Sequence, residues 1–183
     1  MNKILKSLSI LIVSLLFTIT VTSEAGEAKK YVVTINKVDD PTTVSMVLEK
    51  SNLNIKDNYI VGIIPETKAS VIKSSIITSG ARNVTIKNSK GIEIKDTDIL
   101  GTDYKVTIST LLESKTFTLV VKGDTSGDGK VTILDLLQVR KHINGDKKLN
   151  NTRFLAGDTS GDNKITILDL LQVRKHINGD KKL

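Results

Sequence analysis

The chain has 183 residues, a formal net charge of +7 and no cysteine, which leaves room for one domain or two small ones. The absence of cysteine excludes disulfides, a thiol nucleophile and thiolate metal sites. Basic residues are scattered singly among acidic ones with few aromatic residues between them, so the charge indicates a solvated surface and not a nucleic-acid-binding face.

The first 25 residues are typical of a secretory signal peptide. Lys3 and Lys6 precede an apolar stretch over residues 8–21, and small residues suited to cleavage follow at 23–25. A helix that crosses a bilayer needs about 20 apolar residues, and serine and threonine hydroxyls interrupt this shorter stretch. We therefore predict a signal peptide over residues 1–25, a secreted protein, and no membrane contact after cleavage.

Residues 26–122 have the features of a small β-rich α+β domain. A helix is predicted over residues 67–77, another is predicted to begin at Asp40-Pro41, and a hairpin turn is predicted at 89–91. Alternation or β-branched content predicts five short strands, over residues 31–35, 59–63, 84–87, 104–108 and 116–121.

The middle segment lacks a recognisable catalytic set. The chain's histidines, His142 and His176, lie beyond it and are interpreted as surface residues. Because the segment is also small for a sugar cleft, we predict no catalytic residue and no enzyme activity. The alternative is a small glycan-binding module or an accessory glycoside hydrolase. It would use some of the acids Asp57, Glu66, Glu93, Asp96 and Asp98, or the aromatic platforms Tyr31, Tyr59, Tyr104 and Phe117.

A near-identical repeat occupies the C-terminal third of the chain. The sequence GDTSGDGKVTILDLLQVRKHINGDKKL spans residues 123–149 and recurs over residues 157–183, with Gly129 replaced by Asn163 and Val131 by Ile165. An offset of 34 residues also occurs in all-helical repeats, but those lack a turn this rich in glycine and aspartate. The two copies therefore predict a pair of units that closes on itself.

Each copy opens with oxygen-bearing side chains at alternating positions, as a calcium loop requires. Position 7 binds through its backbone carbonyl, so a lysine is compatible there. Position 6 must turn with positive φ, which Gly129 adopts freely and Asn163 tolerates. Magnesium ranks second to calcium because it demands tighter octahedral geometry. The predicted ligands at positions 1, 3, 5, 7, 9 and 12 are Asp124, Ser126, Asp128, Lys130, Thr132 and Asp135, then Asp158, Ser160, Asp162, Lys164, Thr166 and Asp169.

Each loop continues directly into a predicted helix. Thr132 and Asp135 have the spacing of a capping box, and Asn144-Gly145 is a stop signal. Leu134 and Leu168 fall on the polar side of their helices, which favours a partner-binding surface. The helical periodicity assigns the opposite face to the core, with Ile133, Leu136, Val139, Arg140 and Ile143 in the first copy.

The tandem GDxxGDxKxTxxDLLxxRKHI segments over residues 123–183 resemble a type I dockerin, the module that binds cohesin domains in cellulosome-type and related secreted assemblies. The resemblance implies a loop and a helix in each repeat, aspartate at position 12, and one calcium ion per loop, which makes two ions. It implies a cohesin domain of a scaffold or of a secreted enzyme as the partner, in either of two orientations. The implied partner contacts are Ile133, Leu134, Arg140, Lys141, Ile167, Leu168, Arg174 and Lys175.

The partner contacts that the resemblance implies replace the assignment of Ile133 and Arg140 to the core, because a charged arginine is a poor core residue. The predicted fold class is α+β, with a small β-rich domain over residues 26–122 followed by an all-α dockerin of two EF-hand-like loop–helix repeats. The predicted function is that of a secreted, non-catalytic protein that docks onto a cohesin-bearing partner in a polysaccharide-degrading assembly. These boundaries predict that chelation of calcium unfolds residues 123–183 and leaves the middle domain folded.

Overall fold

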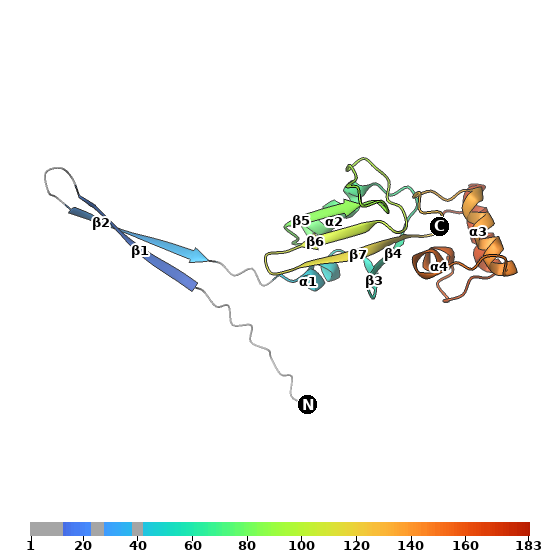
Figure 1. Cartoon of the computed structure of the whole chain (residues 1–183), viewed down its shortest axis with the longest axis horizontal. Helices are drawn as coiled ribbons and strands as arrows, with labels where there is room; N and C mark the ends of the chain where they lie inside the picture. Colours follow the sequence, from blue (N-terminus) through green and yellow to red (C-terminus); the bar gives the residue numbers. More distant parts are fainter. Residues whose placement is uncertain (1–12, 23–27, 38–41) are drawn as a thin grey trace, which may run out of the picture. The chain divides into compact units, whose positions relative to one another are not determined.

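The computed structural model describes two strands near the N-terminus and residues 42–183. Strands β1 (Val13–Thr22) and β2 (Ala28–Lys37) pair antiparallel along their whole length, with Val13 opposite Lys37 (Figure 1). They belong to a first unit, and residues 42–183 form a second compact unit. The predicted strand over 31–35 lies within β2. The predicted signal peptide overlaps β1 and otherwise lies outside the described residues, as does the predicted helix start at Asp40-Pro41.

A mixed five-stranded sheet forms the centre of the second unit. Its strand order is β3-β4-β7-β6-β5, with β4 and β7 parallel and the other neighbours antiparallel. The remaining four predicted strands are confirmed, but β3 was missed because its three residues are all exposed and show no apolar alternation. The strands are β3 (Asn54–Lys56), β4 (Tyr59–Ile63), β5 (Asn83–Lys87), β6 (Lys105–Ser109) and β7 (Ser114–Val121).

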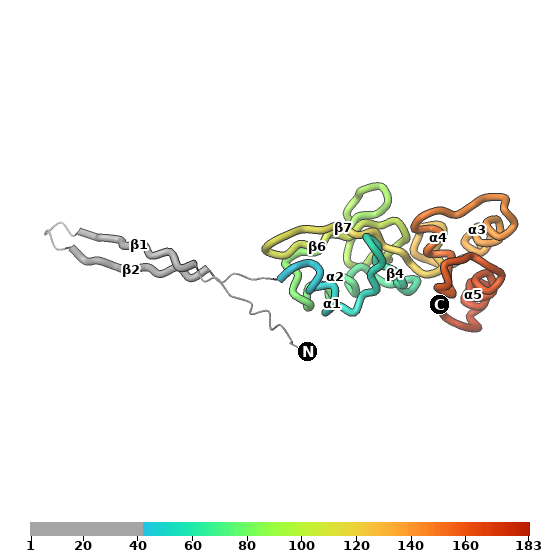
Figure 2. Tube along the Cα trace, turned by 90° about the horizontal axis from the view of Figure 1, so that it is seen from below, coloured from blue at the N-terminus to red at the C-terminus, as the bar shows by residue number. Residues whose placement is uncertain are grey.

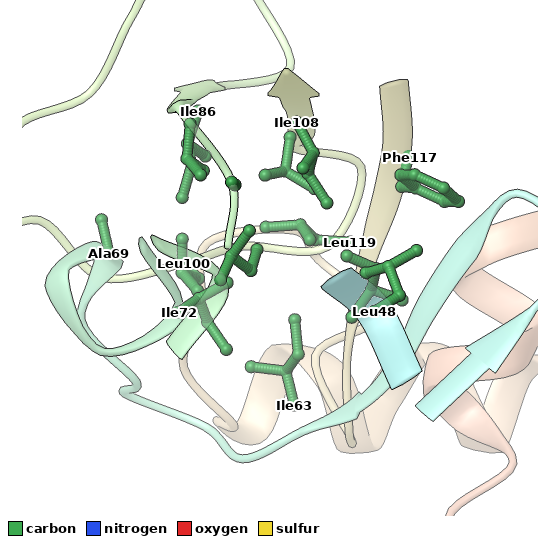
Figure 3. Close-up of a cluster of buried hydrophobic side chains, with 14 of the residues drawn as sticks. Leu48, Ile63, Ala69, Ile72, Ile86, Leu100, Ile108, Phe117 and Leu119 are labelled. Atoms are coloured by element: carbon green, nitrogen blue, oxygen red, sulfur yellow. The ribbon is translucent and has the colours of Figure 1, made fainter. Parts of the chain in front are cut away.

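Helices α1 (Val44–Lys50) and α2 (Ala69–Thr78) contribute to the core on one face of the sheet (Figure 3). Apolar side chains alternate with threonine along β5 and β6, so one face is buried and the other is polar. The helix predicted over 67–77 is confirmed as α2. The strands supply Ile60, Ile63, Val84, Ile86, Val106, Ile108, Phe117, Leu119 and Val121 to this core, and the helices supply Val44, Val47, Leu48, Ala69, Ile72 and Ile76.

The C-terminal part of the second unit contains helices α3 (Ile133–Asn144), α4 (Asn151–Gly157) and α5 (Ile167–Ile177), which gather around a smaller core (Figure 2). Val139 of α3 and Leu149 after it are buried against Ile165. The two repeats also close on each other at their ends. The methyl groups of Leu149 lie beside Gly157, and those of Leu183 lie beside Gly123. The last residue of each repeat therefore packs against the first residue, a glycine, of the other repeat.

The predicted fold class, a β-rich α+β domain followed by a separate all-α module, is wrong. The helices and the mixed sheet belong to one compact unit, and β7 ends at Val121, directly before the first loop. Lys122 then donates a backbone hydrogen bond to Ile63 at 2.8 Å. Helix α4 packs on β7 and β4, where Val120 is only 2% exposed. Local sequence patterns could not reveal these contacts, because the partners are distant in sequence.

We expect the substitution Leu119→Ala to destabilise the second unit by about 3 kcal/mol, because it leaves a cavity at a fully buried position of β7. Leu112→Ala is the matched control, since Leu112 is 59% exposed, and its effect should stay within about 0.5 kcal/mol. Denaturant unfolding of the two variants checks this result. Equal unfolding midpoints would contradict the placement of Leu119 in the core.

Candidate calcium sites and docking face

The first loop, residues 124–135, is organised around two fully buried carboxylates, those of Asp124 and Asp135. Oδ1 of Asp124 accepts hydrogen bonds from the backbone N–H groups of Gly127 at 2.6 Å and Asp128 at 3.1 Å. Its Oδ2 accepts a further bond from Gly129 at 3.0 Å. The loop therefore wraps its own amides around the residue at position 1 and fixes the direction of its carboxylate.

Asp135, at position 12, joins the end of the loop to its beginning. Its Oδ1 accepts a hydrogen bond from the backbone N–H of Ser126 at 2.8 Å, and its Oδ2 accepts one from Thr132 at 2.8 Å. The second bond belongs to the capping box predicted for α3, which is confirmed. Ser126 also donates its hydroxyl to Asp124 at 3.2 Å. Positions 1, 3 and 12 are thus brought together by direct contacts.

The second loop, residues 158–169, repeats this geometry. Ser160 donates its backbone N–H to Asp169 at 2.8 Å and its hydroxyl to Asp158 at 3.3 Å, and Thr166 completes the second capping box. At position 6, φ is 81° for Gly129 and 63° for Asn163. The predicted left-handed turn is confirmed in both loops. Nearly identical sequences therefore fold into loops with the same internal hydrogen bonds.

The predicted ligands at positions 5 and 7 lie toward the outside of the loops. Asp128 and Asp162, at position 5, are exposed, and each accepts a hydrogen bond at 2.9 Å from the backbone N–H of the lysine at position 7. Within the described part of the chain, no group of three or more histidine or acidic side chains already converges as a metal site. A bound ion would therefore draw Asp128 or Asp162 inward to meet positions 1 and 12.

The donor chemistry of the loops suits a hard divalent cation. All side-chain donors at the predicted positions are carboxylate or hydroxyl oxygens, which calcium prefers. Burial raises the pKa of Asp124 above its ordinary value, and the charge of Asp135 raises it further, although amide hydrogen bonds oppose this shift. A bound cation would offset the cost of holding two buried like charges together.

In the second loop, the pKa of Asp169, at position 12, lies below its ordinary value. Burial acts to raise the pKa of this carboxyl, but hydrogen bonds from Thr166 and Ser160 together outweigh burial and lower it.

The predicted partner contacts form an exposed face on α3 and α5. Ile133 is 67% exposed and Leu134 is 50% exposed, and their counterparts Ile167 and Leu168 are 59% and 53% exposed. The four predicted basic contacts, Arg140, Lys141, Arg174 and Lys175, are exposed as well. The helical periodicity alone was wrong for Ile133 and Arg140, which lie outside the core.

A groove of about 420 Å³ lies between α3 and α5 on this face. Sequence reasoning missed the contribution of Leu137 and Leu171 to it. Each leucine lies four residues after an exposed isoleucine at the start of its helix, a spacing that places them on one helical face and could have identified them. The groove is lined by Ile133, Leu136, Leu137, Arg140, Leu170, Leu171 and Arg174.

The two histidines hold the ends of the repeats in place. Nδ1 of His142 accepts a hydrogen bond from the backbone N–H of Leu149 at 2.8 Å, and Nδ1 of His176 accepts one from Leu183 at 3.2 Å. Each bond requires an imidazole that is unprotonated at Nδ1. Sequence reasoning treated both histidines as surface residues and did not foresee this role.

We expect the unfolding free energy to fall as the pH is lowered from about 7 to about 5, partly because of His142. Burial lowers the pKa of His142, and the charge of Lys148 lowers it further. The unfolded chain therefore binds this proton more readily, so the stabilisation is present above the unfolded pKa and is lost as pH falls through the folded one. The variant His142→Asn keeps an acceptor but cannot titrate, so its unfolding free energy should change less over this range. Parallel pH profiles would contradict this expectation.

We call residues 42–122 of the second unit, which contain the five-stranded sheet, the sheet part. A second groove, of about 470 Å³, lies on the sheet part beside α1 and β3. Its lining includes the exposed carboxylates Glu49 and Asp57 and the ring of Phe117, but Phe117 is only 7% exposed and cannot serve as a stacking platform. Two of the other acids considered for catalysis have structural contacts: Asp96 binds Lys73 at 2.7 Å, and Asp98 accepts a backbone hydrogen bond from Lys95 at 2.9 Å.

Comparisons with known proteins agree with the C-terminal geometry. No curated protein and no solved structure matches the chain. Among the described residues, no helix is both long and apolar enough to cross a membrane. Residues 122–178 match the family model of the dockerin type I domain. Such domains are docking modules that bind calcium and have cohesins as partners. The C-terminal part of this chain, with its two loop–helix repeats, is therefore a type I dockerin domain.

Proposed function

We propose that this protein is secreted, does not catalyse a reaction, and attaches through its C-terminal repeats to a cohesin on a scaffold or secreted enzyme in a polysaccharide-degrading assembly. The observation that carries the proposal is the pair of matched loop–helix repeats within a region that matches the type I dockerin family. The signal-like composition of residues 1–25 supports export.

Each loop is proposed to bind one calcium ion. In the first loop the ligands are Asp124, Ser126, Asp128, the carbonyl of Lys130, Thr132 and Asp135; in the second they are Asp158, Ser160, Asp162, the carbonyl of Lys164, Thr166 and Asp169. Support comes from the oxygen-only donor set and from the left-handed turn at position 6 of each loop. Because the carboxylates at position 12 also cap α3 and α5, a bound ion would fix the start of each helix. Calcium therefore shapes the docking face instead of taking part in chemistry.

The proposed contact face consists of Ile133, Leu134, Arg140 and Lys141 with their repeat counterparts Ile167, Leu168, Arg174 and Lys175. The four apolar members are each at least half exposed, which is costly unless a partner covers them. Basic side chains flank the apolar centre, so the complementary partner surface should be apolar in the middle and acidic at its edge. The similar exposure of both copies supports binding in either of two orientations.

Binding of the calcium-loaded full chain to a panel of immobilised cohesins tests this proposal. We expect saturable binding to at least one cohesin, and loss of that binding when calcium is chelated. The parallel assay is hydrolysis of a panel of plant polysaccharides by the same protein, in which no product is expected. Glycan hydrolysis without any cohesin binding would overturn the proposal.

A further inference from the structure

The two loops match in sequence, but their surroundings differ. The first loop is covered by a segment of the sheet part, residues 100–102. Thr102 donates its backbone N–H to Oδ2 of Asp124 at 2.8 Å, and Glu66 donates its own to the carbonyl of Gly129 at 2.9 Å. Asp124 and Gly129 are accordingly buried, whereas the corresponding Asp158 is partly exposed and Asn163 is exposed.

This contact with residues 100–102 explains why position 6 is glycine in the first loop, whereas the second loop, which lacks the contact, has asparagine there. A Cβ atom on Gly129 would lie 2.4 Å from the carbonyl oxygen of Leu100, closer than atoms can approach. Asn163 occupies the same position in the second loop, where its side chain instead accepts a hydrogen bond from Lys56 at 2.7 Å. Glycine in the first loop is thus required by the contact with the sheet part as well as by its φ.

A charged side chain on α4 also links the first loop to the sheet part. Arg153, on α4, donates from Nη1 to the carbonyls of Thr125 and Ser126, the latter at 2.8 Å. Its Nη2 lies 3.1 Å from Oδ2 of Asp103, and Oδ1 of Asp103 accepts a hydrogen bond from the hydroxyl of Thr152. We call Asp103 and Arg153 the clamp. In the second loop, among the described residues, the side-chain hydrogen bond to the sheet part is the one that Asn163 accepts from Lys56, and it is exposed.

We propose that the clamp and residues 100–102 make the first loop a structural part of the sheet, so that calcium bound at the first loop stabilises the sheet while calcium at the second loop does not. This proposal rests on the proposed function in one respect, the binding of calcium by both loops. An ion that binds only the folded loop stabilises every segment that must open together with it. Because the first loop shares backbone hydrogen bonds with the sheet part, the sheet cannot open independently of that ion. The second loop can release its ion while the sheet stays closed.

Hydrogen exchange of the sheet amides tests the proposal in the full chain. Backbone amides of β5 and β6 serve as the probe, since these strands are remote in sequence from both loops. With calcium at about 100 times its dissociation constant, a linked site should slow amide opening about 100-fold. We expect Asp128→Ala, in the first loop, to abolish this protection, and Asp162→Ala, its matched counterpart in the second loop, to leave it intact.

Uncoupling variants examine the contact itself. Gly129→Asn copies the residue of the second loop, so its calcium ligands are retained while its side chain collides with Leu100. It should still bind calcium at both loops by isothermal titration but lose most of the calcium-dependent protection of the sheet. Asn163→Gly is the control in the other loop and should keep the protection. Asp103→Asn removes the charge of the clamp with little change in shape, and it provides a second route should Gly129→Asn fail to fold.

The possible outcomes separate the two proposals. Absence of calcium binding by the unaltered chain would overturn the proposed function and this inference together. Calcium binding at both loops, with equal sheet protection in Asp128→Ala and Asp162→Ala, would overturn only the coupling. Loss of calcium-dependent sheet protection in Asp128→Ala but not in Asp162→Ala would support the coupling.

Discussion

Chelation of calcium is expected to lower the free energy of unfolding of residues 42–183 by about 5 kcal/mol, the largest stability effect that we foresee. Each site that binds only the folded state contributes about 2.7 kcal/mol when calcium is present at about 100 times its dissociation constant. Stabilities of natural domains are only about 5–15 kcal/mol, so the helical repeats should unfold without the ion. Denaturant melts followed by helical circular dichroism, with and without chelator, measure this change.

This expectation differs from the one drawn from sequence, in which the middle domain stays folded without calcium. The hydrogen bond from the backbone N–H of Thr102 to the carboxylate of Asp124, together with the clamp, ties the first loop to the sheet. Tyrosine absorbance should therefore report a calcium-dependent melt too, since Tyr104 is packed against the sheet core. The control is a variant with Asp124→Asn and Asp158→Asn, whose melts should not respond to calcium. Coincident melts of the unaltered chain with and without chelator would contradict the prediction.

Replacement of both Leu134 and Leu168 by aspartate is expected to reduce the affinity for a cohesin partner at least about 100-fold. Both leucines are about half exposed in the free protein, and an interface would bury them beside the basic side chains of α3 and α5. Loss of an apolar anchor of this kind typically costs more than about 2 kcal/mol, and a charge buried without a partner adds to that cost. Surface plasmon resonance against an immobilised cohesin gives the affinity.

The single variants distinguish one binding orientation from two. If either repeat can dock, Leu134→Asp alone should weaken binding only slightly, because the second repeat still presents Leu168. Leu112→Asp is the matched control, since Leu112 is at least as exposed as Leu134 but lies on the sheet part, and it should leave affinity unchanged. Calcium titration of the double variant should match the unaltered chain. Loss of calcium binding in that variant would show that the leucines support the loops and are not contacts.

Local patterns were sufficient for most of the individual elements. Helix α2 was predicted from the turn that precedes it. Helices α3 and α5 were predicted from the capping-box spacing of Thr132 and Asp135, its repeat and the stop signal, and helical periodicity was used to assign their faces. These features depend on residues within a few positions of one another, where backbone hydrogen bonds and helix geometry leave few alternatives. The exposure of Leu134 followed from the same periodicity. The three-residue strand β3 was not predicted because it exists only through its pairing with β4.

The sequence by itself therefore determined the two loop–helix units, the turn at position 6 and the side of each helix on which Leu134 and Leu168 lie. Only the tertiary structure decided that the sheet and the repeats form one unit and that the two loops are unequal. The physical reason is that the deciding contacts depend on backbone N–H groups far from the loop in the chain. That of Thr102 donates to the carboxylate of Asp124, and that of Glu66 donates to the carbonyl of Gly129. Backbone amides and carbonyls are the same in every residue, so no side-chain pattern records which of them will meet.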